Sequence, residues 1–185
     1  MKNISPLALI KTAALMAVFS SVTLRAAETN TAPVRIGTYD SRAVAFAWFW
    51  SDAHQRQLQE FIRTAQAAKA AGDTNRFTEL AASLRQQQDE IHREGFSIAP
   101  PTEALAEIKD RLPEIQRAAG VIDLVSKWDD ATLIKYSAAE KVDVTERLVR
   151  EFHPTDKQLK TITSIEKSEP LSLQKCEELI RKGEI

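Results

Sequence analysis

Three stretches in the middle of the chain carry apolar residues at alternating spacings of three and four. The positions are Leu58, Phe61, Ala65, Ala68 and Gly72, then Phe77, Leu80, Leu84 and Ile91, and then Leu105, Ile108, Leu112, Ile115 and Ala119. Each stretch predicts a helix with one narrow apolar stripe, which buries a seam and not a wide core-facing surface. Residues 42–119 are therefore predicted to be a helical middle segment with an outgoing helix and a broken return helix, most of which forms a coiled-coil-like arm.

Glycine and proline residues mark where these helices begin and end. Gly72 followed by Asp73 predicts the end of the outgoing helix and a cap for the next one, and so short a connection makes the two helices antiparallel. Adjacent prolines in residues 95–101 interrupt the return helix. From there, one element kinked at Pro113 is expected to continue to Gly120.

Aromatic residues crowd the start of the outgoing helix. Residues 46–50 are apolar on nearly every side and must be covered by the sheet, by the return helix or by another subunit. Phe96 and Ile98 add two apolar side chains in the turn-like loop, where packing is favoured over recognition. The candidate partner or client surface therefore comprises Phe46, Trp48, Phe49, Trp50, Phe96 and Ile98.

The remaining pattern predicts strands. Alternating apolar residues predict a strand over residues 34–40, and strand-like runs cover residues 121–128 and 131–136. A helix follows, opened by Asp143 and Glu146 at the spacing of a capping box. The fold class is therefore α+β, a small β-body of about three strands that carries a long antiparallel helical hairpin.

This organisation divides the chain into a body, an arm and a tail. The body comprises residues 34–50 and 120–152, the helical arm residues 51–119, and a C-terminal helical tail residues 153–185. Three short strands and one helix form too small a body to cover its own sheet. Copies of the same chain usually cover such sheet edges, so we expect a homo-oligomer.

The first residues have the composition of an export signal. Residues 1–26 combine two lysines, an apolar run too short to span a bilayer and small residues at the end, so we expect a cleaved signal peptide and a periplasmic protein. Residues 27–33 then form a linker. An uncleaved anchor is the alternative, whereas the processed chain is expected to have no membrane span.

Charge and cysteine content narrow the classes of partner. Residues 1–26 hold three of the 25 basic residues and none of the 26 acidic ones, which leaves the processed chain with a net charge of −4. Such a chain gains little from counterion release, so nucleic acid is not expected as a partner. Cys176 is the only cysteine and is expected to fill an apolar helix stripe, with an intermolecular bridge or a reactive thiol as the alternative.

Several short segments resemble the OmpH family of Skp-like periplasmic chaperones. They are residues 36–40 (IGTYD), 123–126 (DLVS), 133–136 (LIKY) and 142–149 (VDVTERLV), in an order of elements that matches the family over residues 34–152. The resemblance implies a trimer whose β-rich body carries helical tentacles around a cavity for unfolded outer-membrane proteins. It implies no catalytic residue, and the shorter arms and mildly acidic chain depart from the chaperone pattern.

One polar cluster could either bind a small anion or only stabilise the junction between strand and helix. Asp40, Ser41 and Arg42 stand where the first strand meets the outgoing helix, where Arg42 would clamp a small anion at the helix N-terminus. The structural interpretation, which we favour, is that Asp40 or Ser41 caps the helix and Arg42 pairs with an acid such as Asp143.

Other candidates for chemistry are isolated. His54 precedes Leu58 by four positions and is expected to be an interface histidine, with a general base as the alternative. Asp89, His92 and Glu94 share part of a helix but lack a second histidine one turn away, so a solvated polar face is expected. The sequence contains no nucleophile motif or phosphate-binding loop, and no enzyme activity, cofactor or metal is predicted.

Three functions follow as hypotheses. The first is a holdase chaperone that binds unfolded envelope or outer-membrane proteins. The second is a non-catalytic scaffolding protein of the envelope that binds one folded partner through residues 46–50 or the loop at Phe96. The third, which we do not favour, is an exported enzyme that requires Asp40, Arg42 and His54 to converge on one pocket.

Overall fold

The structure is a computed structural model that describes residues 33–185. The expected signal peptide (residues 1–26) and nearly all of the expected linker lie outside the described residues. Twelve elements follow one another in the described part, three of them strands. The α+β class is confirmed: the chain is mostly helical and carries a small three-stranded sheet.

The sheet is parallel, with β1 (Arg35–Tyr39) between β2 (Leu124–Ser126) and β3 (Glu140–Asp143). Thr38 of β1 pairs with Val125 on one side and Asp143 on the other. Gly37 is required at the centre, because a Cβ there would lie 2.7 Å from Leu124 Cδ2. Parallel neighbours need crossover connections, so helices must link all three strands.

The strand predicted at residues 131–136 is wrong, because this segment forms α6 (Asp130–Lys135). Asp129 caps α6 by accepting a hydrogen bond from the Thr132 backbone N–H. The third strand lies instead at residues 140–143. The capping box predicted at Asp143 is also wrong: α7 (Thr145–Arg150) begins after Val144 without a side-chain cap, and Glu146 pairs with Arg150.

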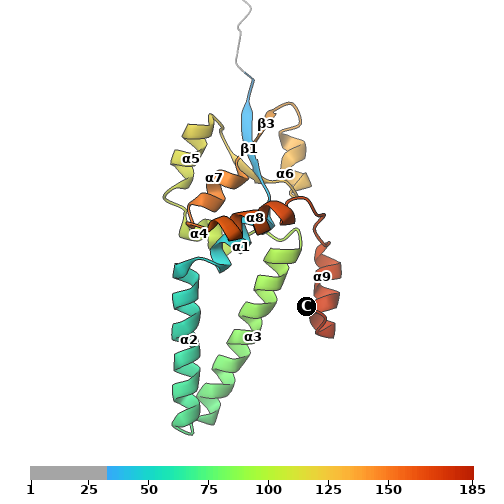
Figure 1. The fold of residues 1–185 in the computed structure, drawn as a ribbon. Coiled ribbons are helices and arrows are strands. Elements are labelled where there is room, and N and C mark those ends of the chain that lie inside the picture. Colours follow the sequence, from blue (N-terminus) through green and yellow to red (C-terminus); the bar gives the residue numbers. More distant parts are fainter. Residues whose placement is uncertain (1–32) are drawn as a thin grey trace, which may run out of the picture. The chain divides into compact units, whose positions relative to one another are not determined.

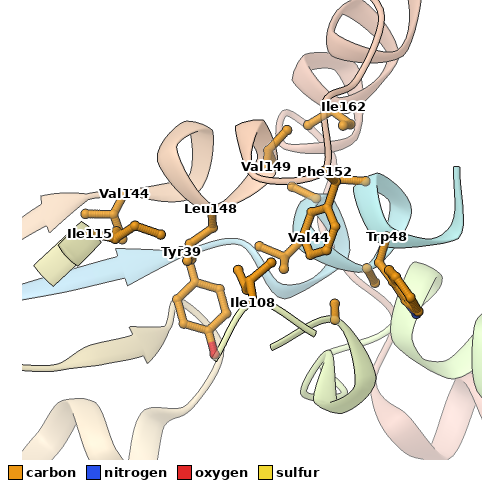
Figure 2. Packing of buried hydrophobic residues seen from close by; sticks show 14 of the residues in the cluster. Tyr39, Val44, Trp48, Ile108, Ile115, Val144, Leu148, Val149, Phe152 and Ile162 are labelled. Atoms are coloured by element: carbon orange, nitrogen blue, oxygen red, sulfur yellow. The ribbon is translucent and has the colours of Figure 1, made fainter. Parts of the chain in front are cut away.

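The aromatic helix α1 (Ser41–Phe49) is covered by elements of the same chain. Asp40 caps it, as predicted, by accepting a hydrogen bond from Arg42 N at 3.0 Å. It contacts α3, α4, α7 and α8, and its inner residues form the core with Tyr39, Ile108 and Leu148 (Figure 2). The outgoing helix is not continuous, because Trp50 ends α1 and Ser51 caps α2 (Asp52–Ala70).

The helices α2 and α3 (Thr74–Phe96) run antiparallel side by side away from the sheet (Figure 1). We call this pair, with its turn at residues 71–73, the hairpin. Gly72 adopts φ 72° in the turn, and Asp73 caps α3 by accepting from Arg76 N. Along most of its length the hairpin buries only Ala65 and Leu80, and Glu94 and Gly95 are buried at its base.

The expected arm of residues 51–119 is too long. The return helix does break at residues 97–101, but α4 (Thr102–Glu107) and α5 (Leu112–Ala119) pack into the core through Ala104, Ile108 and Ile115 (Figure 2). They are two helices and not one kinked element, because Pro113 lies in the first turn of α5, a position that favours helix initiation.

The C-terminal segment packs on both the core and the hairpin. Helix α8 (Asp156–Ile165) contacts α1 and buries Ile162, while α9 (Leu173–Lys182) lies along α3. Cys176 is fully buried there, with Sγ 3.6 Å from the His92 carbonyl oxygen. A backbone bridge between Ser97 and Leu171 ties the two segments together.

Candidate functional site

One hollow lies where the hairpin meets the core. We call it the base groove; its volume is about 630 Å³. Its lining includes Phe49 of α1, His54, Leu58 and Phe61 of α2, Gln87, Glu90, Ile91 and Glu94 of α3, and Glu103 of α4. Of the predicted stripe residues, Leu58, Phe61 and Ile91 reach this groove; Leu58 and Phe61 lie three positions apart and so share a helix face.

Glu94 is the most unusual residue of the base groove. Only 2% of it is exposed, and Oε1 accepts a hydrogen bond from Thr102 N, at the start of α4, at 3.0 Å. Among the described residues its carboxylate has no cationic partner. Burial, with smaller effects from Glu90 and Glu103, raises the pKa of Glu94 to about 7.

The acidic residues of the groove have no basic residues beside them in its lining. No lysine or arginine is among the residues that line it. Glu90 pairs with Arg93 at 2.6 Å, but Glu103 forms no ion pair in the part of the chain that the structure covers. Glutamine and serine side chains, including Gln57, Ser83 and Gln87, complete the polar wall.

His54 is held as an interface residue. Its Nδ1 lies 3.1 Å from the Phe49 carbonyl oxygen, and its ring meets Trp48 in an edge-to-face arrangement with centroids 5.3 Å apart. Asp40 and Arg42 do not line the base groove that contains His54. The three residues therefore form no joint site for acid or base chemistry.

The residues of the candidate partner surface divide into a buried and an exposed group. Trp48 and Phe49 are 2% and 6% exposed and belong to the core, whereas Phe96 and Ile98 are 41% and 36% exposed. Phe46 lies between the groups and packs edge-to-face on Phe96 with centroids 5.8 Å apart. Trp50 is partly buried against Phe46, and the centroids of the two rings are 5.1 Å apart.

The Asp40 cluster is filled by the chain itself. Arg42 forms a two-point ion pair with Asp40, with Nη2 2.8 Å from Oδ2 and Nε 3.1 Å from Oδ1. The same guanidinium donates to the carbonyl oxygens of Ile165, the last residue of α8, and of Ser168 beyond it. It also lies over the Trp128 ring. All these acceptors are protein groups, so the arrangement is a structural clamp and not an open anion site.

The pairing of Arg42 with Asp143 is wrong. Asp143 binds Lys127 at 2.7 Å instead, and its Oδ1 accepts from Thr145 N. The reason is the parallel sheet, which sets Asp40 next to Thr145: Asp40 N donates to Thr145 Oγ1 at 3.0 Å. Ser41 is also buried, and among residues 33–185 its Oγ has no hydrogen-bond partner.

A second hollow of about 780 Å³ lies on another face of α2, between Trp48, Arg56 and Arg111. Its charges are of both signs, and Arg111 is paired with Glu151 at 3.1 Å. The base groove is the stronger candidate because it contains a buried acid without a counter-charge.

Within residues 33–185, no group of three His, Cys, Asp or Glu side chains is placed to hold a metal ion, the trio Asp89, His92 and Glu94 included. Sequence reasoning considered Glu94 only as part of that trio. A signal was available, because Glu94 follows the stripe residue Ile91 by three positions and so extends the buried face of α3.

Comparisons with protein-family models, curated proteins and solved structures find no significant match to the chain. In the part that the structure describes, none of the helices is both long and apolar enough to cross a bilayer. The function must therefore be argued from the geometry and from the residues quoted for the OmpH resemblance.

Proposed function

We propose that this protein is an exported, Skp-like holdase that binds unfolded envelope or outer-membrane proteins in the periplasm. The observation that carries the proposal is the incompletely buried seam of the hairpin. Leu58, Phe61, Phe77, Leu84 and Ile91 are all only partly buried in the single chain. A rigid core thus presents apolar side chains along two helices without covering them.

The chemistry of the seam suits clients without a fixed shape. Apolar contacts are non-directional, and glutamine side chains such as Gln57 and Gln87 both donate and accept hydrogen bonds. A surface of this kind exchanges affinity for breadth of partners. The proposal involves no catalysis, cofactor or metal.

The OmpH resemblance supports the same function. Its segments at residues 36–40, 123–126 and 142–149 lie in β1, β2 and β3 with α7. Residues 133–136 depart from the resemblance, because they belong to α6 and its C-terminal end and not to a strand. The finer part of the proposal is a trimer in which the hairpins of three chains surround a client. It has support in Val34 and Ile122, two large apolar residues that are exposed beside the sheet.

The test is suppression of aggregation of an unfolded outer-membrane barrel protein by a molar excess of the purified chain from residue 27 onward. We expect suppression, and we expect Leu58→Gln combined with Leu84→Gln to reduce it severalfold, because both changes remove apolar surface from the seam. Gln59→Ala combined with Gln66→Ala changes two exposed positions of α2 and serves as the matched control. No suppression by the wild type would refute the proposal.

A scaffolding protein with one folded partner remains the second candidate, favoured by one observation. Phe96 and Ile98 are exposed on a loop held by two backbone hydrogen bonds to Leu171, from Leu171 N to Phe96 O and from Ile98 N to Leu171 O. Stoichiometric crosslinking to one folded partner, lost in Phe96→Ala combined with Ile98→Ala, together with no effect on barrel aggregation, would decide for it.

A further inference from the structure

We propose that the base groove selects client segments in which a cationic side chain stands next to apolar ones, with Glu94 as the group that receives the cation. This inference rests on the proposed holdase function and names the class of segment that the protein binds. Four features of the groove support it: its volume, its apolar wall, its polar residues and its uncompensated carboxylate.

The volume and wall suit a few side chains of an extended peptide. About 630 Å³ lies within the range of pockets that enclose small ligands. Phe49, Leu58, Phe61 and Ile91 form its apolar part. Glutamine and serine residues near them supply donors and acceptors for a peptide backbone, whose polar groups must remain paired when they leave water.

The carboxylate gives the groove its preference. Glu94 is almost fully buried, and the Thr102 backbone N–H is its only hydrogen-bond donor among the described residues. A buried acid without a counter-charge is unfavourable in its ionised form, and a cation placed beside it removes that cost. An arginine or lysine side chain fits because its aliphatic stem packs on an apolar wall while its head meets the acid.

The surrounding charges act in the same direction. His54, Glu90 and Glu103 are the other titratable groups that line the groove. Glu90 already has Arg93 as a partner, and His54 Nδ1 faces a carbonyl oxygen, whereas Glu103 adds negative charge at the rim. Burial is the main cause of the raised pKa of Glu94, and the charges of Glu90 and Glu103 raise it further.

The test compares two fluorescent peptides that differ in one side chain. Both carry Phe and Leu around a central residue, which is arginine in one and its neutral isostere citrulline in the other. We expect fluorescence anisotropy to show the arginine peptide binding at least about ten-fold more tightly, the range of a charge-assisted hydrogen bond. Glu94→Gln should remove the difference, whereas Glu79→Gln, an exposed acid on the same helix, should not.

A second variant protects the test against misfolding. If circular dichroism shows that Glu94→Gln does not fold, Glu103→Gln, which changes an exposed residue, must reduce the preference severalfold. Equal affinity of the wild type for both peptides, or a preference that survives both variants, overturns the inference. Aggregation of the barrel protein is measured separately, so a failed holdase and a failed cation preference give different results.

Discussion

Burial of Glu94 makes the stability of the fold depend on pH. Its pKa is about 7 in the folded chain and near the ordinary 4.5 in the unfolded chain. Between these values the folded state holds a proton that the unfolded state has lost, so stability falls as pH rises through this window. Above pH 7 the buried carboxylate is ionised in the folded state, which lowers the free energy of unfolding by about 3 kcal/mol.

We therefore expect Glu94→Gln to raise the free energy of unfolding by up to about 3 kcal/mol at about pH 8 and by little at about pH 5. Glutamine retains an oxygen that accepts from Thr102 N, so the start of α4 is preserved. Urea unfolding at the two pH values measures the effect. Equal stabilisation at both would show that ionisation of Glu94 is not its cause.

The helix α8 depends on a residue far away in the sequence. Arg42 reaches the carbonyl oxygens of Ile165 and Ser168, at 3.2 and 2.8 Å, where the unpaired carbonyls of a helix end favour a cation. The same guanidinium is ion-paired with Asp40 and only 3% of its side chain is exposed. Arg42 thereby ties the junction of β1 and α1 to the end of α8.

Arg42→Ala is expected to destabilise the chain by about 3 to 5 kcal/mol, because it leaves Asp40 buried without its cation. Amide hydrogen exchange should rise most in α8. Arg150→Ala removes the exposed pair with Glu146 and is the control, with an expected cost below about 1 kcal/mol. Unchanged exchange in α8 would argue against the clamp.

The single chain leaves apolar surface at one end of its sheet. Val34 and Ile122 are 52% and 64% exposed, and they lie together because Ile122 N donates to the carbonyl oxygen of Arg35, the next residue after Val34. Another copy of the chain is a natural cover for such a surface.

Light scattering on the chain from residue 27 onward is expected to give the mass of a trimer. The mass should persist on dilution through the micromolar range, because buried apolar surface and paired sheet edges hold copies together strongly. A monomer at all concentrations would remove the oligomeric part of the proposal.

Local spacing was enough to predict several elements. The turn at Gly72, a break within residues 95–101 and a cap at Asp40 or Ser41 were all predicted, because each depends on residues within a few positions of one another. In the structure α3 continues to Phe96 before the break, and Asp40 is the cap. The α+β class also followed from local patterns. Of the candidate partner surface, Phe96 and Ile98 are exposed, whereas Trp48 and Phe49 are core residues.

Long-range packing decided the rest. Residues 131–136 carry strand-like side chains, yet they form the helical crossover that a parallel sheet requires between β2 and β3. Helices α4 and α5 have the same narrow stripes as the hairpin but pack in the core. Arg42 meets Ser168 across 126 positions, and Glu94 becomes a buried acid only when α4 folds against α3. The spacing of apolar residues indicates which face of a segment is apolar. Which other element packs on that face depends on how the whole chain folds around its core.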